Sequence, residues 1–316
     1  MPESIISSTI SKRIGIIGEC MVELFDQRNG QCKRGFGGDT LNTAVYMARC
    51  APDIAVHYVT ALGDDALSED MLQQWQAEGV LTDTVEQLPG QVPGLYMIQT
   101  DEAGERSFLY WRDQAPAKKL FQTAHAEALQ ERLLTFDWRY YSGITLAVLE
   151  SAGREQLFRL LEQFRSNGGK VAFDINYRPR LWQHDNAEQW IRRAYQHCDL
   201  ALPSFEDECA LWKLQTPQDI LQQLHALGCQ EIVLKRGSDS CLVSESGNAQ
   251  EYLTQAVSKV IDSTAAGDSF NAGYLARRIQ GHNIADAVSC GQSIARQVIT
   301  QQGAIVPIDT EALTIK

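Results

Sequence analysis

The chain has 316 residues, 44% of them hydrophobic, and a formal net charge of −12 from 28 Lys and Arg against 40 Asp and Glu. This acidic balance argues against nucleic acid or an anionic membrane surface as the main partner, because both are bound through basic patches. It leaves room for a small anionic ligand, which a few local Arg or Lys side chains can hold. The length and the hydrophobic fraction suit one α/β domain spanning residues 1–316.

The eight cysteines are scattered and form no C-x-x-C pair, so they predict reduced, mostly buried thiols rather than a disulfide framework or a metal site. Residues 1–13 are polar and rich in serine, without the hydrophobic region of a secretion signal. No apolar run is long enough to cross a bilayer. We therefore expect a soluble, cytoplasmic protein with no membrane partner.

Strand-like and helical segments alternate along most of the chain. Strands are expected over Arg13–Gly18, Val56–Thr60, Trp138–Ser142, Lys170–Asn176, Asp199–Leu202 and Glu231–Lys235. Helices are expected over Ala66–Glu78, Ser151–Ser166, Ala187–His197 and Pro217–Leu227. This order predicts a mostly parallel sheet covered by helices on both faces, that is, a three-layer α/β/α fold. In such folds ligands gather at the C-terminal ends of the strands.

Several short strands interrupt this alternation in the N-terminal third. They are Met21–Asp26, Cys32–Phe36, Pro93–Thr100 and Arg106–Arg112, the last two joined by a turn over Asp101–Glu105. Short strands of this kind do not fit a parallel core. We therefore expect them to form a small sheet, from about residues 19–36 and 92–113, that covers one edge of the core as a lid.

A glycine-rich turn opens a helix after the first pair of these strands. Gly37 and Gly38 let a ligand approach the backbone, and Asp39 and Asn42 could hydrogen-bond the hydroxyls of a polyol. A plain turn with Asp39 or Thr40 as the helix cap is an equal alternative.

The predicted hairpin gathers aromatic residues around an arginine. Alternation along the strand places Phe108, Tyr110 and Arg112 on one face, with Tyr96 across from them. The guanidinium could clamp a carboxylate while the rings cover a carbon chain. A solvated arginine on an edge strand would give the same pattern.

Two polar segments follow strands farther along the chain. Asp174–Arg178 leaves a strand end, where Arg178 could contact a phosphate or a carboxylate, or form an ordinary surface ion pair. Lys235–Ser240 is a turn between two strands whose small polar residues suit a nucleotide phosphate or ribose, although any hairpin turn would look similar.

Near the C-terminus, small residues lead up to Gly267 and Asp268, and a helical pattern begins there. Backbone N–H groups at a helix start form an anion site, so Ala266 and Gly267 are candidates to cradle a phosphate. Asp268 adds a proton acceptor beside that site, which phosphoryl transfer to an alcohol needs. Its place in the first turn predicts a lowered pKa and an ionised carboxylate that takes the proton late. A plain turn and helix cap would use the same residues.

Two tempting motifs are absent. The chain has no G-x-x-x-x-G-K-[ST], so an ATP site here is not a P-loop. Gly15–Gly18 lacks the glycine spacing and the following helix of a dinucleotide-binding loop, which disfavours a nicotinamide-dependent dehydrogenase.

Taken together, these motifs resemble those of the ribokinase-like, or phosphofructokinase-B type, sugar kinases. The two signatures of that family are a Gly-Gly motif in the N-terminal third and a D-T-x-x-A-G-D motif near the C-terminus. They occur at Gly37–Gly38 and Asp262–Asp268, with Ser263 in place of the usual threonine. The resemblance covers nearly the whole chain and implies a ribokinase-like core, ATP with Mg²⁺, and a sugar acceptor.

Within the family, the chain resembles the subgroup of kinases that phosphorylate 2-keto-3-deoxygluconate at its 6-hydroxyl. The stretches that carry this likeness are Arg34–Asn42, Leu95–Tyr96, Tyr110–Arg112, Ser142–Ile144, Asn176–Trp182, Val233–Gly237 and Thr264–Ser269. The resemblance implies that Asp268 is the base and that the backbone of Ala265, Ala266 and Gly267 forms the anion hole for the γ-phosphoryl group.

The resemblance also implies a set of ligand contacts. Together with Asp39 and Asn42 from the glycine-rich turn, the substrate-binding residues would be Gly37, Gly38, Tyr96, Tyr110, Arg112, Ile144, Arg178 and Asp268. The ATP-binding residues would be Asn176, Arg178, Lys235, Gly237, Ser238, Ser240 and Gly267. Some relatives hold a monovalent cation near the positions of Asp262 and Thr264, and some pair their lids in a homodimer. Both are expectations for this chain.

Two alternatives remain open at this point. A fructokinase or ribokinase-type enzyme would use the same framework with a neutral sugar. A non-catalytic sugar-binding regulator would keep the fold and the sugar site without turnover.

Overall fold

The computed structural model describes residues 11–27, 30–100 and 106–313, and its strands form two sheets. The larger sheet has nine strands in the order β13-β12-β11-β10-β9-β8-β1-β4-β5. Its strands are β1 (Arg13–Ile17), β4 (Ala55–Leu62), β5 (Val85–Gln87), β8 (Trp138–Ser142), β9 (Lys170–Asp174), β10 (Leu200–Ala201), β11 (Glu231–Arg236), β12 (Ser240–Glu245) and β13 (Asn248–Leu253). All neighbouring pairs from β11 to β5 are parallel, and only the β11–β12 and β12–β13 pairs are antiparallel. The predicted mostly parallel sheet is confirmed.

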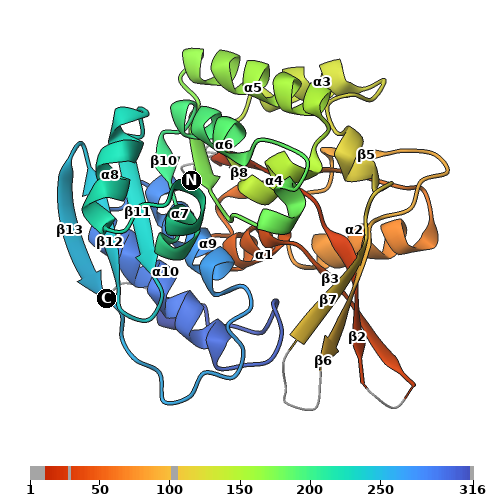
Figure 1. Cartoon of the computed structure of the whole chain (residues 1–316). Helices are drawn as coiled ribbons and strands as arrows, with labels where there is room; N and C mark the ends of the chain where they lie inside the picture. The colour runs from red at the N-terminus through yellow and green to blue at the C-terminus, as the bar shows by residue number, and fades with distance from the viewer. Residues whose placement is uncertain (1–10, 28–29, 101–105, 314–316) are drawn as a thin grey trace, which may run out of the picture.

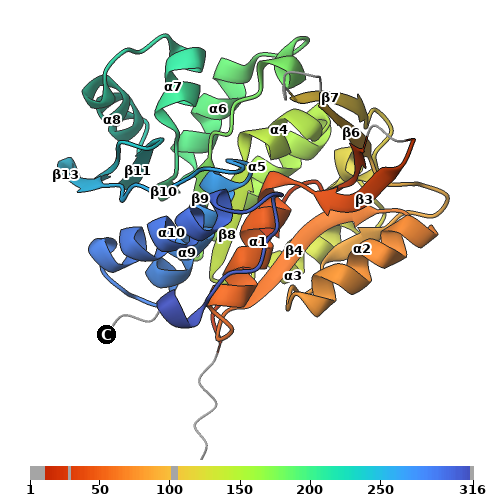
Figure 2. The same cartoon turned by 90° about the horizontal axis from the view of Figure 1, so that it is seen from below.

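Helices cover both faces of this sheet, which makes the core a three-layer α/β/α arrangement (Figure 1). One face carries α1 (Asp39–Cys50), α2 (Ala66–Ala77), α9 (Ala266–Ile279) and α10 (Ile284–Ile299). The other carries α3 (Ala126–Leu133), α4 (Gly143–Val148), α5 (Ser151–Ser166), α6 (Ala187–Gln196), α7 (Phe205–Trp212) and α8 (Pro217–Ala226). Figure 2 shows α9 and α10 on one side of the sheet and α6, α7 and α8 on the other. Short 3₁₀ turns occur at Pro116–Lys119, Pro179–Trp182 and Glu311–Leu313.

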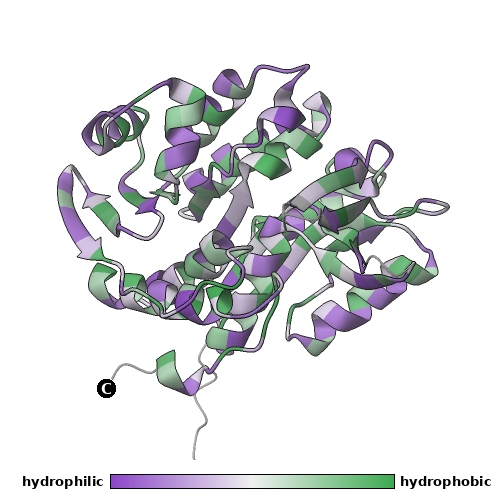
Figure 3. Cartoon of the chain, turned by 60° about the horizontal axis from the view of Figure 1, so that its bottom comes forward, coloured by the Kyte–Doolittle hydropathy of each residue, from purple (hydrophilic) through white to green (hydrophobic). Residues whose placement is uncertain are grey.

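The inner strands of the larger sheet divide their side chains between two hydrophobic clusters. On β8, for example, Tyr140 packs with the α1/α9 cluster and Tyr141 packs with the α5/α6 cluster. This follows from the two-residue period of a strand that is buried on both faces. Green and purple residues mix along the helices in Figure 3, as expected for helices with one face on the sheet and one in water.

The smaller sheet has four strands in the order β3-β2-β6-β7, and we call it the lid sheet. It consists of β2 (Met21–Asp26), β3 (Cys32–Gly37), β6 (Leu95–Thr100) and β7 (Arg106–Trp111), which extend away from the core at the lower right of Figure 1. Strands β2 and β6 are parallel, and each pairs with its hairpin partner in antiparallel fashion. The predicted turn Asp101–Glu105 lies outside the described residues.

Most predicted elements lie within two residues of the observed ones. The main difference is at β9, which ends at Asp174 rather than Asn176, because Asn176 adopts a positive φ of 32° that a strand cannot accommodate. The cysteines are free thiols, of which Cys20, Cys198, Cys229, Cys241 and Cys290 are buried and Cys32 is exposed. Among the residues the structure describes, no helix is long and apolar enough to span a membrane.

Candidate active site

The start of α9 meets the start of α1 at the C-terminal edge of the parallel strands. The Nδ2 of Asn42 donates a hydrogen bond of 2.8 Å to Oδ2 of Asp268, and the hydroxyl of Thr43 donates one of 3.2 Å to the Asp268 carbonyl. Asn42 and Thr43 are buried near the start of α1. Two adjacent residues of α1 therefore fix both the carboxylate and the backbone of Asp268.

The electrostatics of Asp268 differ from what its place in the sequence predicts. Burial of the carboxyl group and the nearby negative charges of Asp39 and Asp174 raise the pKa of Asp268 to about 8, although the bond from Asn42 opposes them. The lowered pKa predicted from the helix start is therefore wrong. A helix N-terminus favours a nearby anion by about 0.3–1 kcal/mol at exposed positions, less than burial and two carboxylates can impose.

The backbone before Asp268 turns sharply into α9. Ala265 caps the helix in the left-handed region, with φ 59° and ψ 15°, and the amide of Ala266 donates to the carbonyl of Ser263 at 3.2 Å. Of the three residues expected to cradle a phosphate, Ala266 thus has its N–H engaged in a turn. Among the described residues outside the backbone of its own helix turn, only Nζ of Lys235 would lie within 4 Å of a Cβ placed on Gly267, at 3.8 Å. The open space at the helix start is therefore beside Gly267, facing an ammonium group.

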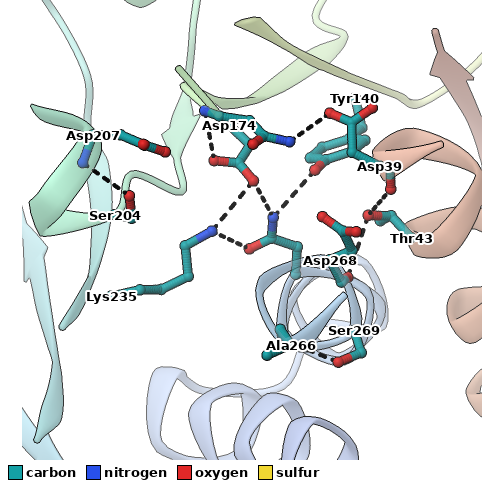
Figure 4. Close-up of polar contacts among 12 residues, drawn as sticks. Asp39, Thr43, Tyr140, Asp174, Ser204, Asp207, Lys235, Ala266, Asp268 and Ser269 are labelled. Carbon is teal, nitrogen blue, oxygen red and sulfur yellow. Dashed lines mark hydrogen bonds and ion pairs between the residues drawn. The ribbon is translucent and has the colours of Figure 1, made fainter. Parts of the chain in front are cut away.

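Lys235, at the end of β11, is held in that position by two buried residues (Figure 4). Its Nζ donates to Oδ1 of Asn271 at 3.0 Å and to Oδ2 of Asp174 at 3.3 Å. Asn271 in turn donates from Nδ2 to Asp174 at 2.7 Å and to the hydroxyl of Tyr140 at 3.1 Å. Lys235 thus lies close to the start of α9, whereas Asn271 and Tyr140 were missed by the sequence analysis.

Asp39 and Asn176 form a second polar contact at the same edge. Nδ2 of Asn176 donates to Oδ2 of Asp39 at 2.7 Å. The hydroxyl of Thr43 lies 3.2 Å from the backbone carbonyls of both Asp39 and Asp268 (Figure 4). Burial raises the pKa of Asp39, while hydrogen bonds from Ser142 and Asn176 lower it. The structure thus brings together Asp39, predicted to bind substrate, and Asn176, predicted to bind ATP.

The glycine pair lies where the core meets the lid sheet. A Cβ on Gly37 would lie 2.2 Å from the hydroxyl of Tyr96, and one on Gly38 would lie 2.2 Å from the backbone oxygen of Glu19. Both glycines are therefore needed for close packing, and neither has a positive φ in the left-handed region. The ligand approach predicted for them stays a prediction.

Arg112 does not stand free on the lid edge. Its Nη2 forms a buried ion pair with Oε2 of Glu19, the residue two positions after β1. Glu19 is 4% exposed and its Oε1 has no partner among the described residues. Burial raises the pKa of Glu19, and Arg112 opposes that rise. Glu19 was missed, and the local signal for it is only a carboxylate shortly after the buried strand β1.

The aromatic face predicted on the lid sheet is confirmed. Tyr96 pairs directly with Tyr110 across β6 and β7, with ring centroids 6.0 Å apart, and the ring centroid of Phe108 lies 6.4 Å from that of Tyr96. The guanidinium carbon of Arg112 lies 5.9 Å from the ring centre of Tyr110. The hydroxyl of Tyr96 donates to Glu23 on the same sheet.

The other predicted residues lie farther from this centre or are engaged elsewhere. Arg178 is exposed, with Nη1 3.7 Å from Asp207 on α7, and Gly237 and Ser238 form the exposed β11–β12 turn. Ser240 is buried and donates to Glu251 at 2.9 Å. Ile144 is half-buried on α4. The contacts with ATP or substrate predicted for these residues stay predictions.

The residues expected near a monovalent cation form a tight turn before α9. Oδ1 of Asp262 accepts from the amide of Thr264 at 3.0 Å and from its hydroxyl at 2.7 Å, and Oδ2 accepts from the amide of Gly303 at 2.9 Å. Within the described ranges, no group of three or more His, Cys, Asp or Glu side chains is placed to hold a metal ion. The cation stays a prediction.

Comparison with known proteins places this site in a family. The profile of the pfkB family carbohydrate kinases matches residues 11–311, which is nearly the whole chain. The chain belongs to this family. A 2-dehydro-3-deoxygluconokinase of Escherichia coli K12 is 47% identical over 304 residues, covering 94% of this chain and 98% of the relative. A protein of the same name from Dickeya dadantii is 46% identical over 308 residues, covering 95% of this chain and 98% of the relative.

Solved structures of similar fold include ribokinase-like kinases with lower sequence identity. The 2-dehydro-3-deoxygluconokinase of Thermotoga maritima superposes with a TM-score of 0.81 at 18% identity, covering 96% of this chain and 98% of that one. The predicted ribokinase-like core is therefore confirmed. As a member of the pfkB family, the protein is a carbohydrate kinase, and the residues gathered around Asp268 are its candidate active site.

Proposed function

We propose that this kinase transfers the γ-phosphoryl group of ATP to the 6-hydroxyl of 2-keto-3-deoxy-D-gluconate, giving 2-keto-3-deoxy-6-phosphogluconate. The observation that carries the proposal is the arrangement at the start of α9, where Asp268 adjoins Gly267 and the ammonium of Lys235 lies beside that glycine. A proton acceptor next to a site for anionic oxygens is what phosphoryl transfer to an alcohol needs. The name shared by the relatives at 46% and 47% identity supports the choice of substrate.

In this proposal Asp268 accepts the proton of the 6-hydroxyl as that oxygen bonds to phosphorus. A carboxylate with a pKa of about 8 is a stronger base than an ordinary aspartate, and about a tenth of it is ionised at pH 7. Asn42 orients it through the 2.8 Å bond to Oδ2. As the bond from phosphorus to the bridging oxygen of ADP breaks, the Gly267 amide and Lys235 stabilise negative charge on the phosphoryl oxygens.

ATP with Mg²⁺ is the proposed phosphoryl donor. A fold neighbour, an E. coli protein described as ribokinase II, was solved in complex with ATP and Mg²⁺; it has a TM-score of 0.81 at 20% identity, covering 93% of this chain and 94% of that one. Mg²⁺ prefers oxygen ligands, and phosphate oxygens and water would supply most of them. Of the chain's own groups, the Lys235 ammonium beside Gly267 fits the phosphate oxygens of ATP, whereas the Asp207 carboxyl already lies 3.7 Å from the Arg178 guanidinium.

Carboxylate recognition is assigned to Arg112 on the lid sheet. Its guanidinium lies against Tyr110 and pairs with Glu19, so it is held at the junction of lid and core rather than left mobile. A planar guanidinium with several donors can contact a substrate carboxylate while it keeps a protein partner. A homodimer, a bound monovalent cation and a cytoplasmic location stay predictions.

The test is an ADP-release assay of the purified protein with 2-keto-3-deoxygluconate, fructose and ribose. We expect the sugar acid to have the highest kcat/KM, and Asp268→Asn to lower kcat by about 10²–10⁴. Asp219→Asn is the matched control, because Asp219 is also the third residue of a helix, α8. Faster turnover of fructose or ribose would assign a neutral sugar instead. Tight binding of the sugar acid without turnover would indicate a regulator.

A further inference from the structure

The side chain of Asn271 occupies a central position among the polar groups at the strand ends. It lies three residues after Asp268 on α9, hence on the same face of the helix, and it is fully buried. Its amide joins three elements: Lys235 on β11, Asp174 on β9 and Tyr140 on β8. These contacts are drawn in Figure 4.

The chemistry of these partners requires an amide at position 271. The ammonium of Lys235 can only donate, so it must meet the carbonyl oxygen of Asn271, and the carboxylate of Asp174 can only accept, so it must meet the NH₂ group. A leucine would satisfy neither partner. An aspartate would place a second negative charge beside Asp174.

Asn271 and Asp174 together define where the ammonium lies. Lys235 has a long, flexible stem, and such a side chain loses rotamer entropy when it is held in one place, so its position needs fixed partners. Here two oxygens from different elements hold it at 3.0 Å and 3.3 Å, with its side chain 14% exposed. The position that results is beside Gly267, at the start of α9.

We propose that Asn271 and Asp174 are positioning residues that hold the Lys235 ammonium at the start of α9, where it stabilises the charge of the transferred phosphoryl group. This inference rests on the proposed function, because it needs the phosphoryl group to be bound at Gly267. A lysine already aimed at that position needs no rearrangement during the transfer step, which is how preorganised charges accelerate a reaction. A purely structural ion pair would stabilise the fold without affecting kcat through Lys235.

The experiment is a double-mutant cycle on kcat with saturating ATP and 2-keto-3-deoxygluconate. We expect Asn271→Leu to lower kcat by roughly 10- to 100-fold with a smaller change in KM for the sugar. In the Lys235→Met background, the same substitution is expected to change kcat by less than about threefold, because the group that it positions is gone. Asp174→Asn, which keeps the size of the side chain, should show the same dependence on Lys235 when kcat is measured above about pH 9, where Asp268 is ionised with or without the Asp174 charge, and it serves if Asn271→Leu fails to fold.

The control is Ser269→Ala, in the same buried turn of α9. The Ser269 hydroxyl donates to the carbonyl of Ala266 at 3.0 Å, so its removal deletes one hydrogen bond within α9 without touching Lys235. We expect wild-type kcat from this variant. If Asn271→Leu and Asp174→Asn lower kcat by the same factor with and without Lys235, or no more than Ser269→Ala, the inference is overturned while the kinase assignment stands. A wild-type protein without kinase activity would overturn both.

Discussion

The hydrogen bond from Asn42 to Asp268 predicts a specific change in the pH dependence of the enzyme. This bond favours the ionised carboxylate, and burial with two nearby carboxylates outweighs it to give a pKa of about 8. Asn42→Leu keeps the volume of a buried side chain and removes the donor. Because Oδ1 of Asn42 has no partner in the described part of the chain, this substitution acts mainly by removing the hydrogen bond to Asp268.

The size of the expected pKa shift follows from the strength of a hydrogen bond to a charged group. A hydrogen bond to a charged group is worth about 1.5–3 kcal/mol, and about 1.36 kcal/mol corresponds to one pKa unit. Losing it should raise the pKa of Asp268 by about one to two units. At pH 7 the ionised fraction, and with it kcat/KM, should fall by roughly 10- to 100-fold, on top of any loss in sugar binding that does not depend on pH.

The assay is kcat/KM from about pH 6 to 10, which reports the ionisation of the free enzyme. The wild type should rise through about pH 8, because a base must be deprotonated to act. The rise should move to higher pH in Asn42→Leu. Thr43→Val is the control, because Thr43 contacts the backbone of Asp268 and not its carboxylate. A rise at the same pH in the wild type and in Asn42→Leu would refute the assignment of this ionisation to Asp268.

Two other predictions concern the junction of the lid sheet and the core. Arg112→Ala should lower kcat/KM for the sugar acid by about 10- to 150-fold. Glu19→Gln keeps an acceptor oxygen that holds the guanidinium but removes the negative charge that repels a bound carboxylate, so it should lower the KM for the sugar acid several-fold. Weaker use of the sugar acid by both variants would contradict this role. Gly38→Ala should reduce the free energy of unfolding by about 1–3 kcal/mol in urea denaturation, because its Cβ would meet the Glu19 backbone at 2.2 Å. Gly35→Ala, whose nearest new contact is 3.5 Å, should lose clearly less; equal losses would show that this close packing is not the cause.

The layered core could be predicted from the sequence because its signals are local. A strand buried on both faces is a short apolar run, and a helix that covers it repeats its apolar residues every three or four positions. The lid strands were also predictable, since β2 follows β1 without a helix between them. Short elements such as β5 and α4 were not predicted, because their three and six residues carry too little pattern.

The polar contacts of the site could be predicted only in part. The local sequence around Asp268 and around Lys235 is enough to make each a candidate site residue. The proposed role of Asn271 instead depends on Asp174 and Lys235, which lie far from it in the chain. Nothing local distinguishes Asn271 from any other polar residue inside an apolar helix. Likewise, Arg112 has the pattern of a solvated edge residue, and only the three-dimensional structure places Glu19 beside it.

The pKa of Asp268 illustrates why the sign of an electrostatic effect can require the whole fold. The helix start acts on Asp268 from within its own turn, so the sequence shows it. Burial and the charges of Asp39 and Asp174 come from packing, and the Asp39 carboxyl accepts from the amide of Asn176, which carries no charge to offset it. The Lys235 ammonium lowers the pKa of Asp268 less than the Asp39 carboxyl raises it. That ammonium is held beside Gly267 by Asp174 and Asn271. The fold thus surrounds Asp268 with negative charge, which would strengthen it as the proposed base, and holds the positive charge of Lys235 beside Gly267, the proposed site of the phosphoryl oxygens.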